Sequence, residues 1–177
     1  MAEKAEDMKV DIILASGSPR RRELMEREGV AFSVRVSQAD ETLDADLLRQ
    51  PEEAAKKLAE RKARAVVEDV LNEGYAGMAM VVGADTMVVA DNVIYGKPVD
   101  EADAKRILGE LSGRAHQVIT GVSVWLVGAP EGEEDISLAF RSFAETSHVL
   151  FRELDDALID AYIATGEPMD KAGAYGV

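Results

Sequence analysis

The stretch IILASGSPRRR (residues 12–22) joins a short apolar strand to a polar, cationic turn and the start of a helix. Ser18 is typical of an N-cap and Pro19 of a first helical position. Arg20 and Arg21 therefore fall in the first helical turn, where the helix dipole mildly disfavours cations. Backbone N–H groups, hydroxyls and guanidinium groups directed at one point suit an oligophosphate. The stretch indicates either a phosphate site or a solvated helix start that carries surface arginines.

Outward from this stretch, strands and helices alternate at first and hairpins dominate later. We expect strands at 10–15, 32–36, 80–83, 87–90, 93–95, 118–127 and 136–151. Helices are expected at 19–28, from 51 to about 72, from the Asp100 cap to about 111, and at 155–165, with 38–46 irregular. This order predicts an α/β fold with a mixed, twisted sheet, in a single domain that spans residues 1–177.

Composition limits the class of protein. The net charge of this 177-residue chain is −14, from 34 acidic and 20 basic residues. A surface for a nucleic-acid polymer is therefore not expected, whereas a pocket for a small polyanion needs only a few local cations and a metal ion. The absence of cysteine excludes disulfides, thiolate nucleophiles and cysteine-bound metal sites. With no apolar signal core and no segment suited to span a membrane, we expect a cytoplasmic protein with no membrane partner.

Two charged residues stand where apolar residues are expected. Asp85 interrupts the apolar run 81–89, and an ionised carboxylate in a buried strand needs a cation, a metal ion or hydrogen-bond donors. It is either a metal ligand or general base, or part of a structural ion pair or turn cap. Lys62 lies four residues from both Leu58 and Val66, on the inward stripe of the long helix. Its ammonium either extends to solvent or points into a polar pocket.

Other polar residues give weaker signals. Lys97 stands between a glycine and a proline in a tight loop, and Glu41 belongs to an acidic loop of a kind that is usually solvated. Arg114 and His116 precede an apolar strand at alternating positions. For His116, a structural hydrogen bond and a contact with a ligand both stay open.

Seven segments together resemble the Maf family of nucleoside triphosphate pyrophosphatases. In family order they are ASGSPRRREL (15–24), the loop around Glu41, LAERKA (58–63), GADTMV (83–88), GKP (96–98), LSGRAHQVITG (111–121) and TGEPMDKAGAYG (165–176). Each segment alone is weak, but the ordered set is specific and covers nearly the whole chain.

The resemblance implies a two-lobed α/β domain with a deep cleft, and a hydrolase that cleaves dTTP and UTP to the monophosphate and pyrophosphate. It implies a divalent cation, Mg²⁺ or Mn²⁺, bound by Glu41 and Asp85. The implied catalytic residues are Asp85, as proton acceptor, with Glu41, Lys62 and Lys97. The residues implied to bind substrate are Ser16, Ser18, Arg20, Arg21, Thr86, Arg114, His116, Asp170 and Lys171, with Arg20 and Thr86 associated with base choice.

The segments 83–86 and 112–116 resemble the dTTP/UTP branch, with modified pyrimidine nucleotides as further candidate substrates. The branch that acts on 7-methyl-GTP usually carries Ser-Asp-Gln where this chain has Ala-Asp-Thr. Two alternatives stay open for the function. The protein could have the same fold with another base preference, such as 7-methyl-GTP, or it could be a nucleotide-binding regulator of cell division and septum formation. Because the family normally continues past Ala-Tyr-Gly-Val with a Gln-Gly pair, a strand and a helix, we also expect a C-terminal truncation and self-association as a homodimer or larger species.

Overall fold

The computed structural model describes residues 9–129 and 136–176 of the chain. The strands are β1 (Val10–Leu14), β2 (Ser33–Val34), β3 (Gly77–Ala90), β4 (Val93–Tyr95), β5 (Ala115–Ala129) and β6 (Ser137–Leu150). The α-helices are α1 (Pro19–Arg27), α2 (Ala45–Leu48), α3 (Pro51–Asn72), α4 (Glu101–Leu111) and α5 (Asp156–Ile163), followed by the 3-10 helices η1 (Glu167–Asp170) and η2 (Ala172–Ala174).

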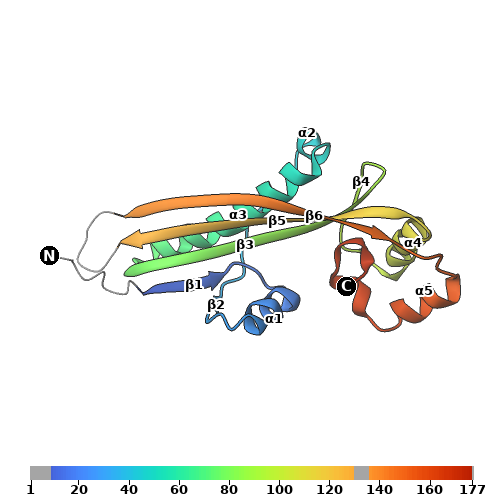
Figure 1. Ribbon diagram of the computed structural model, residues 1–177, viewed down its shortest axis with the longest axis horizontal. Helices are drawn as coiled ribbons and strands as arrows, with labels where there is room; N and C mark the ends of the chain where they lie inside the picture. Colours follow the sequence, from blue (N-terminus) through green and yellow to red (C-terminus); the bar gives the residue numbers. More distant parts are fainter. Residues whose placement is uncertain (1–8, 130–135, 177) are drawn as a thin grey trace. The chain divides into compact units, whose positions relative to one another are not determined.

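A mixed sheet forms the centre of the fold, as predicted (Figure 1). Among the described residues its strand order is β2-β1-β3-β5-β6, with β4 paired to β3 off this path. β1 pairs in parallel with β2 and β3, whereas β4 pairs antiparallel to β3. The combination of parallel and antiparallel pairs confirms the predicted α/β class.

The chain divides into two compact units. The first contains the described residues up to Thr42, together with Lys56–Asp85 and Gly121–Phe143. The second contains Leu43–Ala55, Thr86–Thr120 and the described residues from Ala144 onward. β3, β5, β6 and α3 contribute residues to both units.

In the first unit, α3 lies along one face of the sheet (Figure 1). The predicted bounds of this helix are confirmed, and proline stands at its first position, where the missing N–H costs nothing. The apolar residues of α3 recur at helical spacing and pack on β1, β3 and β5. This core comprises Ile13, Ala15, Ala63, Val66, Val67, Val70, Ala79, Val81, Trp125 and Val127.

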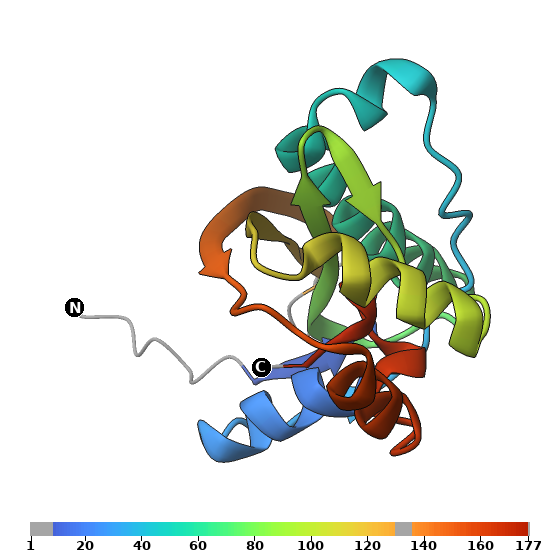
Figure 2. The ribbon, with the colours of Figure 1, turned by 90° about the vertical axis from the view of Figure 1, so that its right-hand side faces the viewer.

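In the second unit, α4 packs against α5 and both 3-10 helices (Figure 2). Asp100 caps α4 through its Oδ1, which accepts the N–H of Asp103 at 2.7 Å. Gly113 follows this helix with a φ of 67°, a left-handed conformation that glycine adopts without strain. Asp91 and Asn92 form the predicted hairpin turn, with φ values of 47° and 63° that are typical of a type I′ turn.

Three local predictions were wrong. The strands expected on either side of Asp85 are one continuous strand, β3, because the charge of Asp85 is paired and the ladder need not break. The strand expected at 32–36 is only Ser33–Val34. The acidic stretch 38–46 runs into the short helix α2, since the Asp44 side chain caps it by accepting the N–H of Leu47 at 3.0 Å.

Within the described ranges, no helix combines the length and apolar character needed to cross a membrane.

Candidate active site in the first unit

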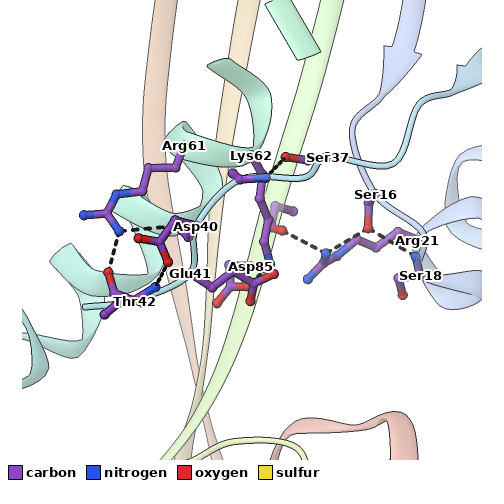
Figure 3. Close-up of polar contacts among 12 residues, drawn as sticks. Ser16, Ser18, Arg21, Ser37, Asp40, Glu41, Thr42, Arg61, Lys62 and Asp85 are labelled. Atoms are coloured by element: carbon purple, nitrogen blue, oxygen red, sulfur yellow. Dashed lines mark hydrogen bonds and ion pairs between the residues drawn. The ribbon is translucent and has the colours of Figure 1, made fainter. Parts of the chain in front are cut away.

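The turn between β1 and α1 holds two of the predicted residues in contact with β3. The Oγ of Ser16 accepts two hydrogen bonds, one from the backbone N–H of Ser18 at 3.2 Å and one from Arg21 Nη1 at 3.0 Å. The same Arg21 nitrogen donates to the backbone carbonyl of Ala84 at 2.8 Å (Figure 3). Arg21 is thus fixed beside the residue that precedes Asp85.

Ser18 differs from its predicted role in one respect. It occupies the N-cap position of α1 with an extended backbone, but its hydroxyl makes no capping hydrogen bond. Its backbone N–H donates a hydrogen bond to the Oγ of Ser16 instead. The first turn of α1 contains no acidic residue, so it presents the positive helix end together with arginine side chains. Such a surface disfavours further cations and suits an anion.

Lys62 and Asp85 form an ion pair between α3 and β3. Lys62 Nζ lies 2.6 Å from Asp85 Oδ1, and the two side chains are only 15% and 12% exposed. The ammonium of Lys62 therefore points inward, and the ion pair that the sequence left open for Asp85 exists. Burial raises the pKa of Asp85, while the charges of Lys62 and Arg21 act in the opposite direction.

A glycine allows this close pairing. A Cβ on Gly83 would lie 2.4 Å from the carbonyl oxygen of Ala59 and 2.7 Å from the nitrogen of Ala63. The backbones of β3 and α3 are therefore in direct contact two residues before Asp85. This contact brings the carboxylate within reach of Lys62.

Glu41 joins the same cluster from the loop that follows β2. Its Oε1 lies 3.1 Å from Lys62 Nζ, although its side chain is 61% exposed. One ammonium is thus shared by two carboxylates that come from distant parts of the sequence (Figure 3). The negative charge of Glu41 adds to the causes that raise the pKa of Asp85.

Two carboxylates of this cluster could hold a divalent cation whose coordination a bound phosphate would complete. No group of three or more acidic or histidine side chains in the described part of the chain could hold a metal ion alone. Mg²⁺, however, is commonly held by one or two carboxylates together with waters and substrate phosphates. Glu41 and Asp85, whose carboxylates lie around the same lysine nitrogen, could provide such a donor pair.

The first unit brings together five of the predicted residues: Ser16, Arg21, Glu41, Lys62 and Asp85. Arg20 lies exposed on the same helix turn as Arg21. Ser18 also belongs to the first unit, and the remaining predicted residues belong to the second unit. Thr86 Oγ1 lies 3.2 Å from Thr120 Oγ1, and Lys97 is exposed.

The other residues of the second unit already have protein partners. Arg114 pairs with Asp91 and donates to the carbonyl of Glu110 at 3.1 Å. Lys171 Nζ lies 2.8 Å from Asp170 Oδ1. The ring of His116 is buried, with Nε2 at 2.7 Å from the hydroxyl of Tyr175, and burial lowers its pKa. His116 therefore has the structural hydrogen bond that the sequence left open.

Curated proteins from several bacteria are similar to this chain over most of its length. A protein from Symbiobacterium thermophilum described as a dTTP/UTP pyrophosphatase is 46% identical over 167 residues, which cover 94% of this chain and 76% of that protein. Proteins with the same description from Moorella thermoacetica and Dictyoglomus thermophilum are 45% identical and cover 94% and 96% of this chain, which corresponds to 77% and 80% of their own lengths. The family model described as Maf-like protein matches residues 11–177, and the chain belongs to the Maf family.

Proposed function

We propose that this protein is a nucleoside triphosphate pyrophosphatase that hydrolyses dTTP and UTP to the monophosphate and pyrophosphate. The observation that carries the proposal is the buried Asp85 carboxylate, which is paired with Lys62 and shares that lysine with Glu41. A protein that merely bound nucleotides would not need a desolvated carboxylate beside an anion site. Family membership and the printed names of the relatives support the same activity.

In the proposed reaction, a water oxygen attacks the α phosphorus and the bond from this phosphorus to the α–β bridging oxygen breaks. Pyrophosphate leaves with the bonding electrons, and the water proton passes to Asp85. Burial suits Asp85 to this role, because a carboxylate with a raised pKa is a stronger base. Arg21 is held by Ser16 and Ala84, so the position of its charge beside Asp85 is set before a phosphate binds.

Glu41 and Asp85 would hold the divalent cation, Mg²⁺ or Mn²⁺, which offsets phosphate charge and acidifies bound water. Lys62 keeps these two carboxylates together in the free protein. By resemblance to the family motifs, we further propose that Lys97 acts in catalysis. The residues proposed to bind substrate are Ser16, Ser18, Arg20, Arg21, Thr86, Arg114, His116, Asp170 and Lys171. Arg20 and Thr86 are the residues proposed to select the base.

A panel of nucleoside triphosphates tests the activity and the base preference together. The purified protein is assayed separately for pyrophosphate and orthophosphate with dTTP, UTP, CTP, ATP, GTP and 7-methyl-GTP, with Mg²⁺, Mn²⁺ or EDTA. We expect pyrophosphate from dTTP and UTP, and no turnover with EDTA. Release of orthophosphate, or equal rates with EDTA, contradicts the proposal. Preference for 7-methyl-GTP favours the other branch, and tight nucleotide binding without turnover favours a regulator.

We further propose that the protein is located in the cytoplasm and that it forms a homodimer. Cell fractionation tests the compartment, and light scattering of the purified protein tests the oligomeric state.

A further inference from the structure

The loop that carries Glu41 lacks regular structure of its own. Between β2, which ends at Val34, and α2, which begins at Ala45, the described chain contains no helix or strand. Glu41 is largely exposed, yet its carboxylate lies 3.1 Å from Lys62 Nζ. A side chain on such a loop keeps one position only when the backbone on either side of it is held.

Arg61 holds that backbone. Its Nη1 donates to the carbonyl of Thr42 at 2.5 Å and reaches the carbonyl of Asp40 at 3.4 Å (Figure 3). These two carbonyls belong to the residues directly before and after Glu41. A tight turn joins the same two residues, because Asp40 Oδ1 accepts the N–H of Thr42 at 2.9 Å.

Arg61 and Lys62 are neighbours in α3, so successive residues of one helix fasten the same loop in two ways. Arg61 holds the loop backbone, and Lys62 pairs with its carboxylate. The helix itself is anchored in the core of the first unit by the adjacent Ala63 and by Val66. The position of Glu41 relative to Asp85 is therefore set by a rigid element rather than by the loop.

We propose that Arg61 is a positioning residue that fixes Glu41 beside Lys62 and Asp85. The inference rests on the proposed pyrophosphatase function for its consequence, because a displaced Glu41 would disturb the reaction more than the binding of nucleotide. The guanidinium of Arg61 acts on backbone carbonyls and so influences the reaction through Glu41.

The test compares Arg61→Met with Arg64→Met in the 177-residue chain. Arg64 lies one turn further along α3, pairs with Glu68 at 2.8 Å and is 64% exposed, so its loss removes the same charge without touching the loop. We expect Arg61→Met to lower kcat for dTTP about tenfold or more, the scale on which misplaced catalytic groups reduce rates, with KM changed less than about twofold. Arg64→Met should change neither constant. The kcat of Arg61→Lys should lie between those of the wild type and Arg61→Met, since an ammonium can donate to a carbonyl but lacks the planar fork of a guanidinium.

Two further readouts separate positioning from general damage. Hydrogen–deuterium exchange of residues 38–44 should be faster in Arg61→Met than in the wild type and unchanged in Arg64→Met. In a Glu41→Gln background, Arg61→Met should add little to the loss of rate, because its effect passes through Glu41. Equal rates for the two arginine variants, unchanged exchange, or a full additional loss in the Glu41→Gln background would overturn the inference.

The experiment also distinguishes this inference from the proposed function. A wild-type protein that releases no pyrophosphate refutes the function, but the exchange measurement still decides whether Arg61 holds the loop. An active wild type with Arg61→Met indistinguishable from Arg64→Met refutes the positioning role alone.

Discussion

Replacement of Lys62 by methionine should destabilise the protein strongly at neutral pH. The Nζ–Oδ1 distance of 2.6 Å corresponds to about 6 kcal/mol of attraction at an effective dielectric constant of ~20. Removal of the Lys62 ammonium also removes the cost of its desolvation, which offsets part of this loss. Arg21 still offers a positive charge to Asp85. Breaking a buried pair typically costs about 3–5 kcal/mol, so with this compensation we expect about 2–4 kcal/mol for Lys62→Met.

Urea denaturation followed by circular dichroism at pH 7 measures the difference. The sign of its pH dependence follows from Asp85, whose pKa in the folded state is raised and should rise further without Lys62. A carboxyl with a raised folded pKa favours the folded state as the pH falls through that value, so the deficit of Lys62→Met should shrink in acid. The double variant Lys62→Met/Asp85→Asn should recover most of the stability at pH 7. If Lys62→Met were as stable as the wild type at pH 7, the ion pair would not hold β3 and α3 together as argued.

Three further predictions concern the same unit. Gly83→Ala should lose more than about 2 kcal/mol of stability in denaturation, since the new Cβ would meet the carbonyl oxygen of Ala59 at 2.4 Å; a stable variant would mean that β3 and α3 separate easily. Ser123→Ala should cost about 1–3 kcal/mol by the same measurement, because the buried Oγ of Ser123 accepts the indole N–H of Trp125 at 2.9 Å; an unchanged midpoint would refute that role. The pH profile of kcat/KM should have an acid limb set by the ionisation of Asp85, with the rate rising as the carboxyl ionises; a limb that persists in Asp85→Asn would belong to another group.

The amphipathic elements of the fold could be predicted from the sequence because their signals are local. The bounds of α3 follow from Pro51 and a stripe of apolar residues, and the hairpin turn follows from Asp91 and Asn92. β3 was predicted as two strands because local patterns give no sign that the charge of Asp85 is neutralised by a residue 23 positions earlier. Such pairing depends on the tertiary fold.

The candidate site was predictable as a set of residue types and less so as a set of contacts. Asp85 and Lys62 stand out because each breaks an apolar pattern, and the structure joins them directly. Arg61 lies within the quoted motif segment 58–63, yet no pattern marks it, since its acceptors are backbone carbonyls that any loop residue could supply. The missing side-chain cap at Ser18 likewise could not be foreseen, because the sequence does not show that the Ser18 N–H donates to Ser16.

The central claim is that water attacks the α phosphorus of a pyrimidine nucleoside triphosphate with Asp85 as the base. Hydrolysis of dTTP in water enriched in oxygen-18, with the products analysed by mass spectrometry, tests it most directly. The account predicts one labelled oxygen in the monophosphate, unlabelled pyrophosphate as the other product, and no products from Asp85→Asn although it still binds dTTP. Label in the pyrophosphate, release of orthophosphate, or near-normal turnover by Asp85→Asn would contradict it.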